Sequence, residues 1–253
     1  MKFHPQSVHI CADAAALTQR AAAVVRDVSR RALAARRRVA IAACGGDATR
    51  AVFEAIGTAG LPWQHVHVFA SSACWPRESP PGGAVAQACT RLLELPAPRQ
   101  NVHAVPIDIA DPQVAAGAYE QQVRAFFGVA RGELPRFDLV MMQLGVDGHA
   151  ASLYPFSSSL DETVRIAVAE YVNQLGTHCV TFTAPLINQA HDILLLATGA
   201  AVADALRATL DGVFDPTRYP VQLLRPVEGT LHLLADREAA ARLDASSLTG
   251  RAA

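Results

Sequence analysis

Short apolar runs that alternate with helix-like segments are the feature that most constrains the fold of this 253-residue chain. The apolar runs predict strands at Val39–Ala43, His65–Ala70, Asn101–Val105, Asp138–Leu144, Cys179–Ala184, Ile193–Thr198 and Leu231–Ala235. Apolar spacing and capping residues predict helices at Ala12–Arg37, Ala48–Ile56, Ala84–Leu95, Asp111–Ala130 and Gly199–Leu210, and one from Asp236 onward. Continuous apolar strands separated by helices indicate a parallel sheet covered on both faces. The sequence therefore predicts an α/β fold with a mostly parallel sheet.

We expect the chain to form one domain. No change of composition marks a linker and no internal repeat is found, so the domain should span residues 1–253. In a fold of this class the ligand binds at the carboxyl ends of the strands. The segments that follow Ala43, Ala70, Leu144 and Thr198 are therefore the expected location of a site.

The balance of charges excludes several classes of function. The formal net charge is -1, with 22 basic and 23 acidic residues, which does not suggest binding to nucleic acid.

No signal-peptide pattern and no long apolar run is found, so we expect no membrane contact and a cytoplasmic location. Lys2 is the only lysine, which excludes an internal Schiff-base lysine and a Walker-type phosphate loop. Any bound phosphate must be held by arginine, backbone N–H groups or a helix N-terminus.

The cysteines and histidines show no pattern of a disulfide framework or a metal site. The five cysteines are scattered, odd in number and never spaced as CxxC, which indicates a reducing cytosol rather than disulfide bonding. His65 and His67 share one face of a predicted strand, but no third ligand is apparent beside them. We therefore expect no bound metal.

The run QLGVDGHAASLYP, from Gln143 to Pro155, is the strongest candidate for chemistry. An apolar strand leads into a loop with two glycines, which permit tight turns and close approach of a ligand to the backbone. His149 could act there as a general base near neutral pH, and Asp147 could orient its ring or hold a loop amide. The alternative is a loop histidine that is hydrogen-bonded for structural reasons.

This run resembles the signature GMGEDGHTASLFP of the 6-phosphogluconolactonases, in the glucosamine-6-phosphate isomerase/6-phosphogluconolactonase superfamily. The resemblance covers most of the chain. Cys44–Thr49 takes the place of the family's SGGSTP loop, and Val180–Asn188 is similar to its VTLTLPVIN segment. Thr198-Gly199 resembles the start of its TG helix, and Leu231–Ala240 its closing WFLDEAAA stretch.

The resemblance implies a single-domain, Rossmann-like α/β fold and a carboxylic ester hydrolase that needs no cofactor. Its substrate would be a small sugar lactone, 6-phosphoglucono-δ-lactone, which is hydrolysed to 6-phosphogluconate in the pentose phosphate pathway. It implies catalysis by His149 as general base with Asp147 assisting. We expect a monomer or small homo-oligomer. Candidate substrate-binding residues are Gly45, Gly46, Asp47, Arg50, Arg77, Gly145 and Gly148.

Several departures from the family pattern concern its phosphate-binding cations. The arginine of its DER motif aligns with Cys74, the arginine of its RVTLT strand with Cys179, and the lysine after its TG turn with Val202. Asp47 replaces a serine in the glycine-rich loop, where a carboxylate caps a helix well but competes with a bound anion.

Arg50 and Arg77 could compensate for the lost cations, or could be solvated surface residues. The departures leave open a lactonase for a non-phosphorylated or different sugar lactone and a non-catalytic sugar-phosphate-binding paralogue. An isomerase or deaminase is less consistent with the residues after His149, because they follow the lactonase pattern.

Overall fold

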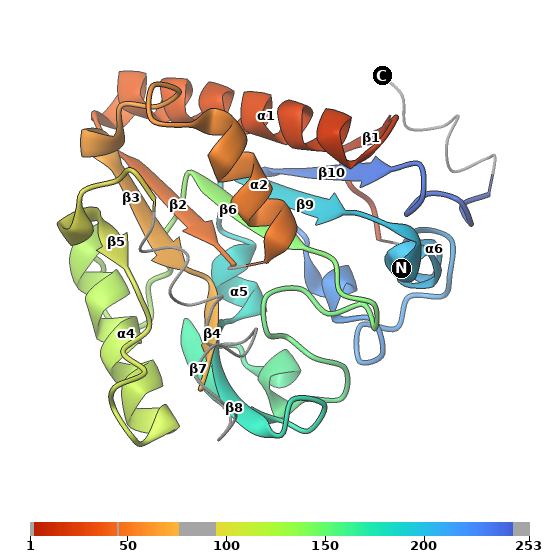
Figure 1. Cartoon of the computed structure of the whole chain (residues 1–253). Helices are drawn as coiled ribbons and strands as arrows, with labels where there is room; N and C mark the ends of the chain where they lie inside the picture. The colour runs from red at the N-terminus through yellow and green to blue at the C-terminus, as the bar shows by residue number, and fades with distance from the viewer. Residues whose placement is uncertain (1–2, 45, 76–94, 245–253) are drawn as a thin grey trace.

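A parallel sheet of seven strands forms the centre of the computed structural model, which describes residues 3–44, 46–75 and 95–244. The strands lie in the order β1-β10-β9-β6-β2-β3-β5, and all neighbours are parallel (Figure 1). They are β1 (Ser7–Cys11), β2 (Val39–Ala43), β3 (Val66–Ala70), β5 (Val102–His103), β6 (Leu139–Gln143), β9 (Asp192–Ala197) and β10 (Thr230–Asp236). The expected α/β class with a mostly parallel sheet is therefore confirmed.

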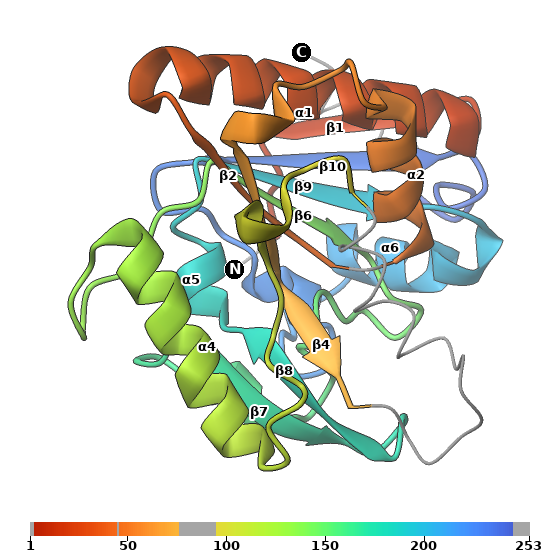
Figure 2. The same ribbon diagram turned by 60° about the vertical axis from the view of Figure 1, so that its left-hand side comes forward.

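Helices lie on both faces of this sheet. On one face are α1 (Ala14–Arg36) and α2 (Asp47–Ile56), and on the other are α5 (Ala184–Ile187) and α6 (Ala203–Leu210) (Figures 1 and 2). α1 begins where the Asp13 carboxylate accepts a hydrogen bond from the Ala16 N–H at 2.7 Å, which satisfies one of the unpaired donors of the first turn. None of the described helices has the length and apolar character that crossing a membrane requires.

Two buried aspartates at the amino ends of β6 and β9 attach α1 to the sheet. Asp138 forms an ion pair with Arg36 and accepts the Ala40 N–H at 2.8 Å. Asp192 pairs with Arg31 at 3.1 Å and with His232 at 2.8 Å. These carboxylates therefore have partners that offset the cost of removing them from water.

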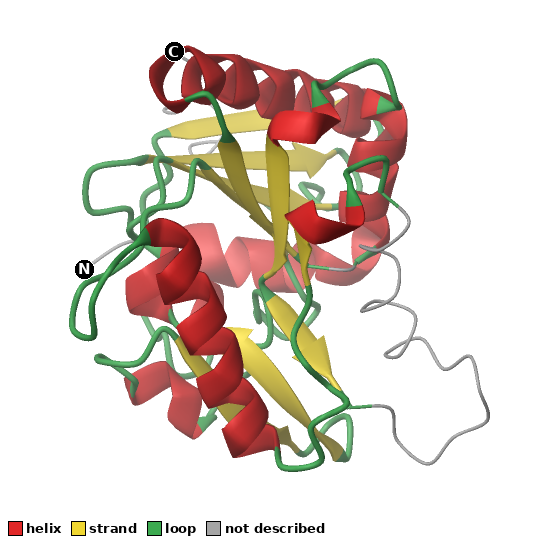
Figure 3. Cartoon of the chain, turned by 90° about the vertical axis from the view of Figure 1, so that its left-hand side faces the viewer, coloured by secondary structure: helices red, strands yellow, loops and turns green. Residues whose placement is uncertain are grey.

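A second, smaller sheet continues from the end of β3. It consists of antiparallel strands β4 (Ser72–Cys74), β8 (Thr177–Phe182) and β7 (Ala167–Val172), in that order. Ser71 links the two sheets, because its N–H donates to Ala43 and its carbonyl accepts from Phe182, both at 2.9 Å. α4 (Pro112–Phe127) packs against β7 and β8 (Figure 3). The strand expected at Cys179–Ala184 thus belongs to this antiparallel sheet.

The helix expected from Asp236 onward is wrong. The chain turns there because the Asp236 carboxylate accepts the N–H groups of Ala239 at 2.8 Å and of Gly199 at 2.9 Å. That carboxylate joins the end of β10 to the end of β9 and holds the last described turns. Most of the helix expected at Ala84–Leu95 lies outside the described residues.

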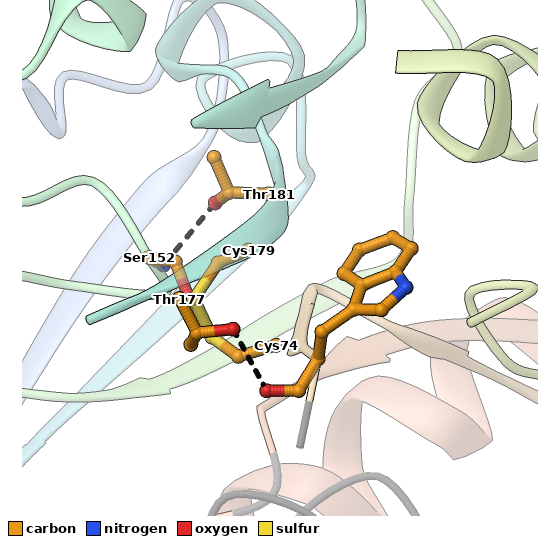
Figure 4. Close-up of a disulfide and its surroundings, with 6 residues drawn as sticks. Cys74, Ser152, Thr177, Cys179 and Thr181 are labelled. Atoms are coloured by element: carbon orange, nitrogen blue, oxygen red, sulfur yellow. Dashed lines mark hydrogen bonds between the residues drawn. A yellow bond between two sulfur atoms is a disulfide. The ribbon is translucent and has the colours of Figure 1, made fainter. Parts of the chain in front are cut away.

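A disulfide between Cys74 and Cys179 joins β4 to β8 (Figure 4). The two cysteines are opposite each other in the antiparallel register although they are 105 residues apart in sequence. The expectation of a chain without disulfide bonding is therefore wrong. Cys11 and Cys44 are free thiols. Sequence spacing could not reveal this pairing, because it depends on the register of two short strands that are distant along the chain.

Removal of this disulfide is expected to destabilise the fold. A bridge that closes a loop of this length restricts the unfolded chain, and its loss costs about 2–4 kcal/mol of unfolding free energy. The double variant Cys74→Ala, Cys179→Ala should unfold at a lower urea concentration than oxidised wild type. Cys44→Ala removes a free thiol and is the control. A wild-type urea midpoint that does not respond to reductant would contradict the prediction.

Candidate active site

The run from Gln143 to Pro155 begins at the carboxyl end of β6, near the middle of the large sheet. β3 and β5 lie on the far side of β2, whereas β9 and β10 lie on the far side of β6. The strand order therefore reverses between β2 and β6. Ligands of open parallel sheets bind at such a reversal, outside the carboxyl ends of the strands.

Two glycines let the loop after β6 fold back on itself. The Gly148 N–H donates to the Gly145 carbonyl at 3.0 Å, and the Gly145 N–H donates to the His149 carbonyl at 2.9 Å. Gly148 has a φ of 84°, a conformation that costs other residues free energy. A Cβ on Gly145 would lie 2.1 Å from His149 Nδ1, so the imidazole packs directly against this glycine. The His149 ring thus occupies the space that the Cβ of any other residue at position 145 would fill.

Asp147 and His149 form a hydrogen-bonded pair. The Asp147 Oδ1 atom lies 2.6 Å from His149 Nδ1 and also accepts the His149 backbone N–H at 3.1 Å. With the carboxylate as acceptor, Nδ1 carries the proton and Nε2 keeps a free lone pair. Both side chains remain partly accessible, with exposed fractions of 31% and 25%. The pair can therefore reach a ligand and act on it as a general base.

The surroundings of the pair favour an ionised carboxylate. Burial raises the pKa of Asp147, but the hydrogen bonds and charge of His149 outweigh burial, and the net pKa lies below its ordinary value.

Tyr154 stacks on the His149 ring at 4.3 Å between centroids. Burial, together with the charge of Asp147, raises the pKa of Tyr154 to about 12. Tyr154 therefore stays neutral near pH 7 and limits rotation of the imidazole.

The backbone after His149 is strained. Ala151 and Phe156 adopt φ values of 54° and 62°, which are rare for residues with a Cβ. Strain of this kind persists only where surrounding contacts enforce it, and it is common at functional sites. Here Ser152 donates its N–H to the Thr181 hydroxyl at 3.2 Å, and the Phe156 N–H donates to the Thr217 carbonyl at 2.9 Å.

The glycine-rich loop after β2 lies against the end of β6. A Cβ on Gly46 would lie 2.7 Å from Gln143 Oε1, and the same oxygen accepts the Ala48 N–H at 3.4 Å. Gly46 is the N-cap of α2 and, having no side chain, makes no capping hydrogen bond of its own. The structure therefore brings Gly46 and the loop of Gly145 and Gly148 to the same edge of the sheet. Gly45 lies outside the described residues.

Asp47 and Arg50, the charged candidates of this loop, lie on the solvent-exposed side of α2. Asp47 is the first residue of α2 rather than its N-cap, its side chain is 78% exposed, and it lies 3.9 Å from Arg50. Arg50 also pairs with Glu54 along the outside of the helix. The Asp47 carboxylate therefore lies in solvent beside Arg50. Arg77 lies outside the described residues.

The structure adds Arg218 and Tyr219, which the sequence did not single out. Both line a pocket of about 400 Å³ together with Val146, Asp147 and Phe156. Their segment lies far from the motif in sequence and has no regular apolar pattern. Only the fold shows that these residues are neighbours of the loop after β6.

Comparison with known proteins identifies the family. The model of the glucosamine-6-phosphate isomerases/6-phosphogluconolactonase family matches residues 12–233. The chain belongs to this family. A family member from Synechocystis, named 6-phosphogluconolactonase, is 34% identical over 90% of this chain and 94% of its own length. A 6-phosphogluconolactonase from Nostoc is 33% identical over 94% of this chain and 98% of its own length.

Solved structures of the same family share the fold. The 6-phosphogluconolactonase from Trypanosoma cruzi superposes with a TM-score of 0.81 at 22% identity, covering 96% of this chain and 98% of that one. A monomeric glucosamine-6-phosphate deaminase superposes with a TM-score of 0.71 at 19% identity, covering 93% and 99%. The expected Rossmann-like family fold is thereby confirmed.

Three positions where the family resemblance places cations hold none in this family member. Cys74 and Cys179 are bonded to each other, and Val202 is 4% exposed. Cys74 Sγ lies 3.7 Å from Ser152 Oγ, so the disulfide borders the loop that carries His149. At the first two of these positions a neutral covalent bond thus replaces two positive charges.

Substituting Gly145 by alanine is expected to displace the His149 ring. The added Cβ would overlap the imidazole, which must rotate away and lose its hydrogen bond to Asp147. Gly117→Ala, at a helical glycine where a Cβ meets nothing within 4 Å, is the control. NMR of the imidazole should show changed ring chemical shifts and loss of the hydrogen-bonded Nδ1–H signal for Gly145→Ala alone. Identical imidazole spectra for wild type and Gly145→Ala would rule out this packing.

Proposed function

We propose that the chain hydrolyses 6-phosphoglucono-δ-lactone to 6-phosphogluconate, a step of the pentose phosphate pathway, without a cofactor. The observation that carries the proposal is the Asp147–His149 pair at the strand-order reversal of the sheet. The family relatives that are named 6-phosphogluconolactonases support this substrate. Both cover most of the chain, so the proposal concerns the whole domain.

In the proposed reaction, His149 Nε2 takes a proton from a water molecule. The hydroxide adds to the lactone carbonyl and forms a tetrahedral oxyanion. As the bond between this carbon and the ring oxygen breaks, the imidazolium returns its proton to that oxygen, which becomes a hydroxyl group. The new carboxylic acid then ionises and releases one proton. Asp147 stabilises the transient imidazolium and keeps Nε2 directed at the water.

The N-terminus of α2 is suited to the negative charge of the reaction. The first N–H groups of a helix have no partner within the helix and attract anions. We place the substrate between this terminus, at Gly46, and the loop of Gly145 and Gly148. Gly45 belongs to the proposed binding loop by its position in the sequence.

His149→Ala is expected to lower kcat by about 10²- to 10⁴-fold, because it removes the general base. The rate is measured as proton release in a pH-stat, with spontaneous lactone hydrolysis subtracted. His178→Ala, at an exposed histidine of β8, is the matched control. A wild-type rate equal to the spontaneous rate would overturn the proposed activity, and an active His149→Ala would overturn the proposed base.

Asp147→Asn is expected to lower kcat less than His149→Ala and to change its pH dependence. The pKa of Asp147 lies below its ordinary value, so the wild-type carboxylate remains charged through neutral and mildly acidic pH. An amide no longer stabilises the imidazolium, so the acidic limb of the kcat profile should move to lower pH. An unchanged limb would show that the carboxylate does not act on the imidazole.

The phosphate of the substrate is expected to matter. Charge-assisted hydrogen bonds to a phosphate each contribute about 1.5–3 kcal/mol, so kcat/KM should be about tenfold or more higher for 6-phosphogluconolactone than for glucono-δ-lactone. Equal kcat/KM values would favour a lactonase for unphosphorylated sugars. Binding of 6-phosphogluconate without any turnover would favour a non-catalytic paralogue.

A cytoplasmic location and a monomer or small homo-oligomer remain part of this proposal. The disulfide beside the site bears on the location, because such bonds are rare in a reducing cytosol. Thiol labelling of the protein in intact cells would show whether Cys74 and Cys179 are bonded there.

A further inference from the structure

A pocket of about 400 Å³ opens beside the Asp147–His149 pair, a volume that suits a small-molecule ligand. Asp147 lines it together with Phe156 from the same loop. It is also lined by Asp204 of α6 and by Arg218 and Tyr219, which precede η6 (Pro220–Leu223). A ligand in this pocket would contact the carboxylate that supports the imidazole.

Arg218 is the one cation among the residues that line this pocket. Its guanidinium lies over the Tyr219 ring, 5.6 Å from the centroid. Across residues 3–44, 46–75 and 95–244, no carboxylate forms an ion pair with this guanidinium. The two acids of the pocket do have partners, since Asp147 binds His149 and Asp204 pairs with Arg242.

The segment of Arg218 is held firmly against the loop of His149. The Tyr219 ring packs on Gly148, where an added Cβ would lie 2.8 Å from the ring. The Val221 N–H donates to the Gly148 carbonyl at 2.9 Å. Gln222 is fully buried, and its amide accepts the Asp215 N–H at 2.7 Å and donates to carbonyls of the preceding segment. The backbone of Arg218 is therefore placed by the same contacts that place the reactive loop.

We propose that Arg218 binds the phosphate group of the substrate and thereby sets the preference for a phosphorylated lactone. This inference rests on the proposed function. A guanidinium presents several N–H donors in a planar fork that matches phosphate oxygens, and stacking on Tyr219 keeps the fork oriented. The lactone ring then extends from Arg218 toward Asp147 and His149, with the carbonyl at the imidazole.

Arg50, the other described cation considered from the sequence, is less suited to this role. Arg50 pairs with Glu54 and Asp47 on the outer side of α2, and a phosphate would have to displace these carboxylates. Cys74, Cys179 and Val202 carry no charge. Arg218 has no carboxylate to displace among the described residues, so its charge is available to an anion.

Arg218→Ala and Arg218→Lys test the proposal by steady-state kinetics with 6-phosphogluconolactone and glucono-δ-lactone. Loss of a contact that holds the substrate equally in ground and transition states raises KM and leaves kcat unchanged. Arg218→Ala should raise KM for the phosphorylated lactone by about ten- to hundredfold. The KM of Arg218→Lys for the phosphorylated lactone should lie between those of wild type and Arg218→Ala. Neither substitution should change kcat/KM for glucono-δ-lactone. Arg207→Ala, at an exposed arginine of α6 outside the pocket lining, is the matched control.

Calorimetry with 6-phosphogluconate separates failure of this proposal from failure of the proposed function, because it needs no turnover. Wild type should bind 6-phosphogluconate more tightly than gluconate, and Arg218→Ala should lose this difference while its thermal midpoint stays near that of wild type. The role of Arg218 is refuted if Arg218→Ala binds 6-phosphogluconate as tightly as wild type does. It is also refuted if Arg50→Ala loses this binding and Arg218→Ala does not. A wild type that binds but does not hydrolyse refutes only the proposed activity.

Discussion

Strand β6 is hydrogen-bonded on both of its edges, to β2 and to β9, and this double pairing determines where a reactive loop can lie. When both edges of a strand are hydrogen-bonded to neighbours, only the segments that precede and follow the strand can form loops. At the amino end, Asp138 is buried and paired with Arg36, so its charge serves to attach α1. At the carboxyl end, Asp147 is partly exposed, lines a pocket and is hydrogen-bonded to the imidazole of His149. The two aspartates of this segment have different partners because one precedes the strand and the other follows it.

Much of the central sheet and the reactive loop could be predicted from the sequence. Apolar runs such as Val39–Ala43 and Ile193–Thr198 become buried parallel strands because strands covered on both faces need apolar residues at every position. The pairing of Asp147 with His149 was also accessible, since two residues that are separated by one position in a tight glycine loop lie within reach of each other. In both cases the decisive contacts are local or follow from a short repeating pattern.

The features that escaped prediction depend on contacts between distant segments. β4 has three residues and no periodicity, and its pairing with β8 exists only once the whole sheet is assembled. The disulfide follows from that register. The turn at Asp236 replaces an expected helix because a carboxylate binds Gly199 on the adjacent strand end. Arg218 was missed for the same reason, since nothing in its own neighbourhood in the sequence points to the loop of His149.

The packing of Tyr219 on Gly148 has a consequence for how specificity can diverge within this fold. The residues proposed to activate water lie in one loop, and the residue proposed to select the anion lies in a surface segment encoded much later in the gene. In the proposed role of Arg218, a substitution there changes which anions the pocket attracts and leaves the hydrogen bond between Asp147 and His149 in place. The residue proposed to select the anion and the residues proposed to act on water therefore lie in different segments of the chain, so substrate preference can change by substitution at Arg218 while Asp147 and His149 stay as they are.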